Sequence, residues 1–450
     1  MSMATEGRLG KARARDWPGV LRQILPASFW RAFLGAWEPV GDGRTHWSPK
    51  QVVLCWLLMG WLHEPGLGAR FTGAWRTLAA LFPRRRRPGR TYPGLLKSSQ
   101  RIGTRALRQF LNCLRARLPA LLGPLWTWYG WHVFAVDGSR VEAPRTRANQ
   151  RALGQASRAG SGPQWWVTTL IHLPSRVLWD WRQGPGTASE RDHLRQMLGH
   201  LPTGTLLLAD AGFTGFALLG CLQRRGIDFL IRCGAHVHLL RDDSRARRAA
   251  GPEESQWVYL WPQRCRRQRP LRLRLIVLKR GRRRMYLLTN VLEPTRLPRR
   301  VAAELYAARW GIEVNYRSLK QTLERRQLQA RTPAAGHWEL AGNLLALALL
   351  LVQSAWLRGL QAPRASVAQL WRALRAALEC LWWGAGARWY RRAVQQASRD
   401  DYVRRRSKCA RDWRAKKREQ PPGAPFLRRL TRAEKAQIIR WEHDAIRQVG

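Results

Sequence analysis

Residues 203–233 read "TGTLLLADAGFTGFALLGCLQRRGIDFLIRC", and this stretch decides the fold class. "TGTLLLAD" is a short apolar run that ends in Asp210, and "IDFLIRC" is a second apolar run. Such runs, bounded by turn residues, are typical of buried strands. "GFALLGCLQRRG" between them predicts a helix that stops at Gly226, because glycine commonly ends helices. The stretch therefore predicts strand, helix and strand, which is the alternation of an α/β sheet.

The residues upstream extend this sheet. "WHVFAV" from 131 predicts a strand that ends in Asp137, Gly138 and Ser139. "QWWVTTLIHL" and "RVLWDWR", separated by "PS", predict a β-hairpin. "TASERDHLRQMLGHL" predicts a helix in which Thr187 and Glu190 form a capping box. Together these elements favour a mixed sheet with helices on its faces.

The remaining residues predict flanking domains and one insertion. "WSPKQVVLCWLLMGWL" predicts a helix capped by Ser48. "PRRRRPGRTYPG" from 83 predicts an exposed basic loop, which either suits binding of DNA ends or is only a solvated face. "PLRLRLIVLKRGRRRMYLLTNV" predicts an antiparallel hairpin that turns at Gly281 and is basic on one face. The predicted domains are a helical DNA-binding domain (1–125), a first catalytic part (126–235), a β-rich insertion (236–300), a second catalytic part (301–357) and a basic helical region (358–450).

A polar pattern occupies residues 306–320, "YAARWGIEVNYRSLK". We expect one helix from 299 to about 328. At about 100° per residue, Tyr306, Arg309, Glu313 and Lys320 then fall within an arc of roughly 60°. Apolar residues form a second stripe beside them, so the helix can dock on a core. One interpretation is a solvated face with ion pairs. The other is a carboxylate at the rim of a site.

Net charge narrows the class of partner. The chain of 450 residues has 80 Lys and Arg residues against 29 Asp and Glu, a formal charge of +51. Such a charge implies a polyanion, most plausibly nucleic acid, although the excess of arginine could partly reflect the base composition of the coding DNA. Seven scattered cysteines with no CxxC pair predict reduced thiols. The apolar runs "VVLCWLLMGWL" and "LLALALLLV" are shorter than a membrane span, so we expect a cytoplasmic protein with no membrane partner.

Three carboxylates are the candidate chemical groups. Asp137 and Asp210 each follow an apolar strand, and Glu313 lies on the polar stripe. An aspartate before glycine is also ordinary turn chemistry. Three carboxylates that converge would repel one another unless cations were bound between them. Two Mg²⁺ ions meet this need, and they would suit phosphodiester chemistry on DNA.

The order Asp, Asp, Glu on a ribonuclease-H-like fold resembles the DDE transposases. The spacing of Tyr306, Arg309, Glu313 and Lys320 resembles the "YREK" signature of the IS-four insertion-sequence family, supported by "DGSRVEAPRTRANQ" and "ADAGFTGFALLGCLQRRGIDFLIR". The resemblance implies that Asp137, Asp210 and Glu313 are metal ligands for Mg²⁺, with Mn²⁺ able to substitute. It implies that Tyr306, Arg309 and Lys320 hold DNA phosphates.

The resemblance also implies an activity and partners. A bacterial transposase binds the terminal inverted repeats of its element, cuts and joins double-stranded target DNA, and forms a homodimer in its synaptic complex at the nucleoid. The alternatives are a structure-specific nuclease on the same fold and an inactive DNA-binding remnant of a mobile element. A glycosidase with paired carboxylates does not account for the charge of +51.

Overall fold

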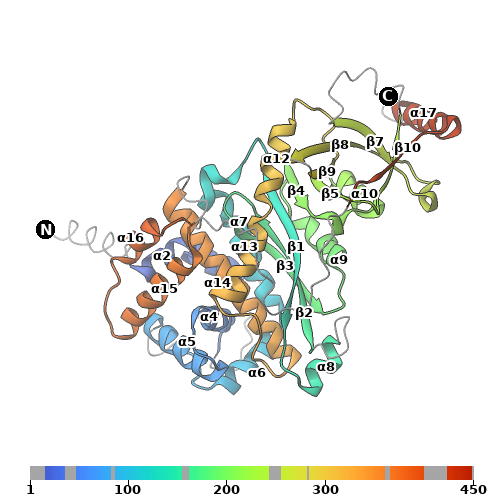
Figure 1. Ribbon diagram of the computed structural model, residues 1–450. Coiled ribbons are helices and arrows are strands. Elements are labelled where there is room, and N and C mark those ends of the chain that lie inside the picture. Colours follow the sequence, from blue (N-terminus) through green and yellow to red (C-terminus); the bar gives the residue numbers. More distant parts are fainter. Residues whose placement is uncertain are drawn as a thin grey trace. The chain divides into compact units, whose positions relative to one another are not determined.

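The structure is a computed structural model that describes residues 16–35, 47–82, 87–154, 162–242, 255–280, 283–359, 365–399 and 423–447 (Figure 1). The chain forms two compact units. Unit 1 comprises Met1–Thr127, Gly138–Ser189 and Gly311–Tyr402, and unit 2 comprises Trp128–Asp137, Glu190–Trp310 and Val403–Gly450. The boundaries between them fall after Thr127, inside strand β1 (His132–Glu142), before helix α9 (Glu190–Met197), between helices α12 (Arg299–Ala308) and α13 (Gly311–Arg317), and after Tyr402.

Unit 1 holds most of the helices. Its elements are α2 (Trp17–Ile24), α3 (Ala27–Leu34), α4 (Pro49–Trp61), α5 (Leu67–Leu81), α6 (Tyr92–Ile102), α7 (Arg105–Leu122), the second half of β1, α8 (Arg147–Leu153), β2 (Gln164–His172), β3 (Val177–Pro185), α13 (Gly311–Arg317), the π-helical turn Ser318–Thr322, α14 (Pro333–Arg358), α15 (Val367–Trp382) and α16 (Tyr390–Gln396). The described part of 1–125 is thus helical, as predicted.

Unit 2 holds most of the strands. Its elements are the first half of β1 (His132–Glu142), α9 (Glu190–Met197), β4 (Thr205–Ala209), the 3₁₀ turn Ala211–Phe213, α10 (Phe216–Arg224), β5 (Asp228–Cys233), β6 (His238–Arg241), β7 (Ser255–Leu260), β8 (Leu271–Arg280), β9 (Arg283–Thr289), α12 (Arg299–Ala308), β10 (Phe426–Arg429) and α17 (Arg432–Arg447). The predicted strand, helix and strand of residues 203–233 are confirmed as β4, α10 and β5.

The described strands are hydrogen-bonded in the order β10-β6-β7-β8-β9-β5-β4-β1-β2-β3. β4 is parallel to β1 and to β5, whereas β2 and β3 form the predicted antiparallel hairpin. The order β3-β2-β1-β4-β5 is that of a ribonuclease-H-like mixed sheet, which confirms the predicted α/β fold class. β1 is shared, since its first half pairs with β4 in unit 2 and its continuation belongs to unit 1.

The end of the first predicted strand was wrong. β1 does not stop at Asp137 but runs on to Glu142. The ladder to β4 is recorded only as far as Ala135 opposite Leu208, because β4 itself ends at Ala209. Asp137 therefore lies where one neighbour of β1 has ended while the strand continues. The sequence shows the polar residue but not which partner strand leaves it.

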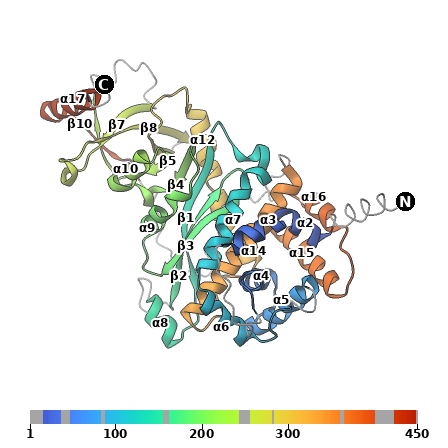
Figure 2. The same cartoon turned by 180° about the vertical axis from the view of Figure 1, so that it is seen from behind.

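α14 is the central helix of unit 1 (Figure 2). It has 26 residues and begins at Pro333, so it is longer than the predicted apolar helix 339–357. By length and composition it could cross a membrane, yet 94% of its most apolar window is buried within the protein. It packs against α4 at a close backbone contact. A Cβ at Gly342 would lie 2.6 Å from the carbonyl oxygen of Trp56, so only glycine permits this approach.

Among the N-terminal helices, the start of α4 agrees with the prediction from sequence and the start of α6 does not. Ser48 and Gln51 form a capping box at the start of α4, as the motif predicts for Ser48. The prediction that 83–94 is all loop was wrong, because α6 begins at Tyr92 with Thr91 as N-cap and a proline in its first turn. Proline is tolerated there since the N–H it lacks would be unpaired anyway. Residues 83–86 of the basic run lie outside the described residues.

The C-terminal residues complete the β-rich insertion rather than forming a helical region alone. β10 pairs in parallel with β6, and α17 packs its Ile438 into a cluster with Leu240, Tyr259 and Trp261. The predicted hairpin is confirmed as β8 and β9, but its faces are less regular than the alternating sequence suggests. Arg274 is only 2% exposed and donates to the carbonyl of Leu297 at 2.6 Å. A buried arginine is tolerable here because a backbone carbonyl receives it.

The single helix expected from 299 to about 328 was also wrong. α12 ends at Ala308, α13 runs from Gly311 to Arg317, and a π-helical turn follows. At the break, Trp310 N–H donates to the carbonyl of Ala307, three residues back, at 3.4 Å. The chain leaves the helix at Glu324, which has a φ of 56°. The 60° arc drawn on an ideal helix therefore does not apply, since each break rotates the residues that follow it.

Candidate active site

Asp137 and Asp210 both belong to unit 2 and lie at the same edge of two adjacent strands. The parallel register pairs His132 with Thr205 and Ala135 with Leu208. Continued by two residues, it sets Asp137 beside Asp210. Partners in register on parallel strands point to the same face of the sheet and are separated by about 4.8 Å between strands. The two aspartates singled out in the sequence are thus neighbours at the carboxyl end of β4.

A backbone contact sets the orientation of Asp210. Its Oδ1 accepts a hydrogen bond of 2.8 Å from Gly212 N–H, so the carboxylate caps the 3₁₀ turn Ala211–Phe213. This is the turn chemistry that the sequence left open as an alternative. It occupies one oxygen of the carboxylate with a neutral donor. Turn capping and a functional role are therefore compatible in this residue.

Glu190 is a functional candidate that the sequence analysis interprets as a helix cap rather than as a ligand. The predicted capping box with Thr187 does not form, because α9 begins at Glu190 itself. A Cβ built on Gly212 would lie 2.9 Å from Glu190 Oε1 and 3.0 Å from Asp210 Oδ1, so the two carboxylates flank the same point. Burial and the charge of Asp210 raise the pKa of Glu190, whereas Arg191 lowers it. No spacing rule in the sequence links Glu190 to Asp210, since the contact arises between a helix start and a strand end.

Tyr306 and Arg309 lie in the same unit as Asp210. Tyr306 is 6% exposed, and burial raises the pKa of its hydroxyl to about 12, opposed by Arg309 and Arg232 and reinforced by Asp210. These charges are therefore close to the Tyr306 ring. The Arg309 guanidinium carbon lies 5.6 Å from the ring centre, in the range of a cation–π contact. The structure thus brings together Tyr306 and Arg309.

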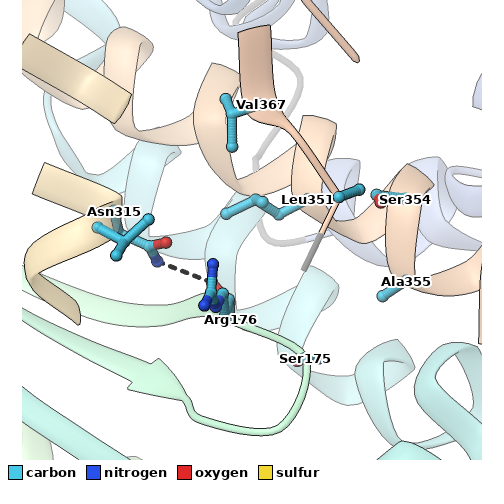
Figure 3. Close-up of a pocket in the computed structure, with 9 residues that line it drawn as sticks. Ser175, Arg176, Asn315, Leu351, Ser354, Ala355 and Val367 are labelled. Atoms are coloured by element: carbon cyan, nitrogen blue, oxygen red, sulfur yellow. Dashed lines mark hydrogen bonds between the residues drawn. The ribbon is translucent and has the colours of Figure 1, made fainter. Parts of the chain in front are cut away.

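Glu313 lies in the first turn of α13 in unit 1 and is partly exposed. The helix is anchored to the β2–β3 hairpin. Asn315 Nδ2 donates to the carbonyl of Arg176 at 2.8 Å, at the rim of a small pocket (Figure 3). Tyr316 Oη donates to the carbonyl of Val167 on strand β2 at 3.2 Å and accepts from Thr169 Oγ1, on the same strand, at 3.0 Å. The residues that follow Glu313 therefore fix its helix on the sheet.

Lys320 reaches the first aspartate motif. Its Nζ lies 2.7 Å from Ser139 Oγ, a contact within unit 1. Ser139 is two residues beyond Asp137 on the same strand. Lys320, the last residue of the 306–320 pattern, therefore contacts a residue that follows the first predicted ligand by two positions. It does so from a π-helical turn, which the sequence did not predict.

The carboxylates suit a hard divalent cation, because such ions take oxygen ligands and offset the repulsion between neighbouring acids. Asp137, Asp210 and Glu190 supply oxygens of this kind in unit 2. Within the described residues, no group of three or more His, Cys, Asp or Glu side chains gathers closely enough to hold a metal ion. A site formed by Asp137, Asp210 and Glu313 stays a prediction.

Comparison with known proteins finds similarity to transposases. Residues 130–349 match the family model described as a transposase DDE domain. This span includes Asp137, Asp210 and every residue of the 306–320 pattern. This part of the chain is similar to a transposase DDE domain. The transposase InsG for insertion sequence element IS4, from Escherichia coli strain K12, is 28% identical over 273 residues, which are 58% of this chain and 60% of that relative.

A solved structure gives a more distant similarity. The structure described as the piggyBac transposase synaptic complex with hairpin DNA matches 84% of this chain and 81% of its own, at 10% identity and a TM-score of 0.42. The match to InsG supports the IS4 type that the "YREK" spacing indicates.

Proposed function

We propose that this protein is a DDE transposase of a bacterial insertion sequence, which binds the terminal inverted repeats of its element, cleaves DNA strands there and transfers them to a target. The observation that carries the proposal is the register of β1 and β4, which aligns Asp137 with Asp210 at one sheet edge. Carboxyl ends of parallel strands are where open α/β sheets build their sites. The family match and the charge of +51 support DNA as the substrate.

In this proposal Asp137, Asp210 and Glu313 hold two Mg²⁺ ions, and Mn²⁺ can substitute. Such a pair supplies an activated water and stabilises the leaving oxygen of a phosphodiester. The protein's own part is to fix the carboxylates before DNA arrives. The Gly212 N–H orients Asp210, and the anchors at Asn315 and Tyr316 hold the helix of Glu313.

The cationic residues of the 306–320 pattern take the phosphates. The Arg309 guanidinium lies over the ring of Tyr306. Because Tyr306 is buried, its ring orients the guanidinium rather than contacting solvent. Lys320 is held by Ser139 beside the first aspartate motif. We further propose that two copies assemble on a pair of element ends, in the bacterial cytoplasm at the nucleoid. The strand-end aspartates and the phosphate-binding cations then act on the same DNA strand.

The test is cleavage by the purified full-length protein of DNA that carries its element's ends. Cleavage is expected with Mg²⁺ or Mn²⁺, none in EDTA, and none on DNA with scrambled ends. Asp210→Asn is the matched variant, since it keeps the size of the side chain and removes the charge. Cleavage of branched DNA without end preference would instead identify a structure-specific nuclease. End binding with no cleavage under any metal would identify an inactive remnant.

A further inference from the structure

Arg191 holds the turn that follows β4. From the first turn of α9 its Nε donates to the carbonyl of Gly212 at 2.6 Å, and its Nη2 donates to the carbonyl of Thr214 at 3.0 Å. Two parallel donors on one planar group fix both carbonyls relative to each other. The helix start and the strand-end turn are therefore joined by a single side chain, 19 residues before Asp210 in the sequence.

The same turn orients Asp210. Gly212 donates its N–H to Asp210 Oδ1 at 2.8 Å while its carbonyl accepts from Arg191. The two interactions act on the two sides of one residue. On the far side of the turn, Thr214 Oγ1 donates to the carbonyl of Arg232 on β5 at 2.8 Å. A shift of Arg191 would therefore move the N–H that holds the carboxylate.

The turn leaves little room for adjustment. A Cβ on Gly212 would lie 2.9 Å from Glu190 Oε1, and a Cβ on Gly215 would lie 3.3 Å from Arg191 Nη1. The first Cβ would displace Glu190 Oε1, and the second would require Arg191 Nη1 to move by a few tenths of an ångström. Residues 212 and 215 are thus fitted to the carboxylates on one side and to the guanidinium on the other.

We propose that Arg191 is a positioning residue for Asp210. By holding the carbonyls of Gly212 and Thr214, it fixes the turn that presents the Asp210 carboxylate for metal binding. The inference rests on the proposed function, in which Asp210 binds a divalent cation. Residues that orient a metal ligand typically change metal affinity or activity by on the order of 10- to 100-fold when they are altered.

A simpler role for Arg191 is to offset the charges of Glu190 and Asp210, and Arg191→Lys separates the two roles. Lysine keeps the positive charge but cannot donate two hydrogen bonds in a fixed fork. If only charge mattered, Arg191→Lys would behave as the unaltered protein. If the fork positions the turn, the lysine variant should lose metal affinity.

The experiment measures Mn²⁺ binding to the full-length protein by electron paramagnetic resonance, and end cleavage as a function of Mn²⁺ concentration. Arg191→Lys should raise the Mn²⁺ concentration needed for half-maximal binding and cleavage by on the order of tenfold. Affinity for end DNA and the melting temperature should change little. Arg195→Lys is the matched control, because Arg195 lies on the same helix and pairs only at the surface, with Asp192 at 2.6 Å.

A second variant tests the turn without touching the arginine. Gly212→Ala should also raise the required Mn²⁺ concentration, since the added methyl displaces the carboxylates. Arg191→Lys with unaltered Mn²⁺ binding would overturn the inference, as would a loss fully accounted for by a lower melting temperature. If the unaltered protein neither binds Mn²⁺ through Asp210 nor cleaves ends, the proposed function fails and the inference fails with it. Unaltered protein that binds Mn²⁺ without cleaving still tests Arg191 by the binding measurement alone.

Discussion

Asp137 and Asp210 in unit 2 and Glu313 and Lys320 in unit 1 are held in place by different kinds of interaction. The aspartates are aligned by the backbone register of two parallel strands and by a turn N–H. Glu313 and Lys320 lie on short helical segments that are anchored by side chains, through Asn315, Tyr316 and Ser139. Strand register follows directly from an apolar sequence pattern, whereas side-chain anchors are specific to this tertiary structure.

The two units also differ in the contacts that surround these residues. In unit 1, Glu339 of α14 is 3% exposed, lies 3.6 Å from Arg70 and accepts from the N–H groups of Gln329 and Ala330. Arg325, 1% exposed, donates to the carbonyls of Gly60 and Leu62. This buried network fixes the chain just after the turn that carries Lys320. In unit 2, the turn after Asp210 depends on Arg191 and on backbone contacts.

The largest effect on end cleavage should come from removing a carboxylate from either unit. We expect Glu313→Gln and Asp137→Asn each to lower end cleavage by about 10³-fold or more, since several kcal/mol of charge stabilisation is lost. Affinity for end DNA and the melting temperature should stay close to those of the unaltered protein. Rates are compared on the same end substrate. Cleavage by Glu313→Gln at the unaltered rate would show that the Glu313 carboxylate takes no part in the reaction.

Breaking the buried network should unfold unit 1 rather than alter the chemistry directly. Glu339→Leu removes the buried carboxylate that pairs with Arg70 and the acceptor of two backbone N–H groups, which should cost about 3–5 kcal/mol of unfolding free energy. Urea unfolding followed by circular dichroism measures it. Glu379→Leu serves as control, because Glu379 is exposed on α15 and should change stability by less than about 0.5 kcal/mol. Equal stability of the two variants would contradict a supporting role for the network.

The cationic residues should matter for DNA binding in both units. Arg309→Ala and Lys320→Ala should each weaken end binding or slow cleavage by more than about tenfold, because a charge-assisted contact is worth about 1.5–3 kcal/mol. A solvated surface pair would instead contribute about 0–1 kcal/mol, to folding only. Thermal stability is measured beside end cleavage for each variant. Lys320→Arg keeps the charge and should recover part of the binding; a loss fully explained by melting would refute the DNA contact.

The smallest expected effect is a pH dependence confined to unit 1. Burial and the charge of Arg108 lower the pKa of His337 to about 4, from an ordinary value near 6.5. The unfolded chain therefore binds this proton first as pH falls from 6.5 towards 4, so stability is lost across that window. At pH 5 the loss should be about 1–2 kcal/mol relative to pH 7. His337→Gln should remove that part of the dependence in urea unfolding, and an identical pH profile would refute it.

The fold class, the hairpin of β2 and β3, the end of β4 before Asp210 and the capping of α4 could all be predicted from sequence, whereas the continuation of β1 past Asp137 could not. Each depends on contacts within a few residues or on a hydrophobic period. The breaks between α12, α13 and the π-helical turn could not be predicted this way. An apolar stripe continued through residues 305–323, and only packing decided where the helix rotates. Strand β10 was missed because a four-residue strand has little pattern of its own.

The sequence by itself determined which residues are available for chemistry: Asp137 and Asp210 beside apolar strands, and the spacing from Tyr306 to Lys320. Tertiary structure decided what surrounds them. In the folded protein the carboxylates of Glu190 and Asp210 both lie beside Gly212, and Arg191 donates to the carbonyl of Gly212. Lys320 contacts Ser139. These contacts join residues 20 to 181 positions apart, and side-chain approach over such separations is fixed by how elements pack. Local pattern specifies the elements, and packing specifies their neighbours.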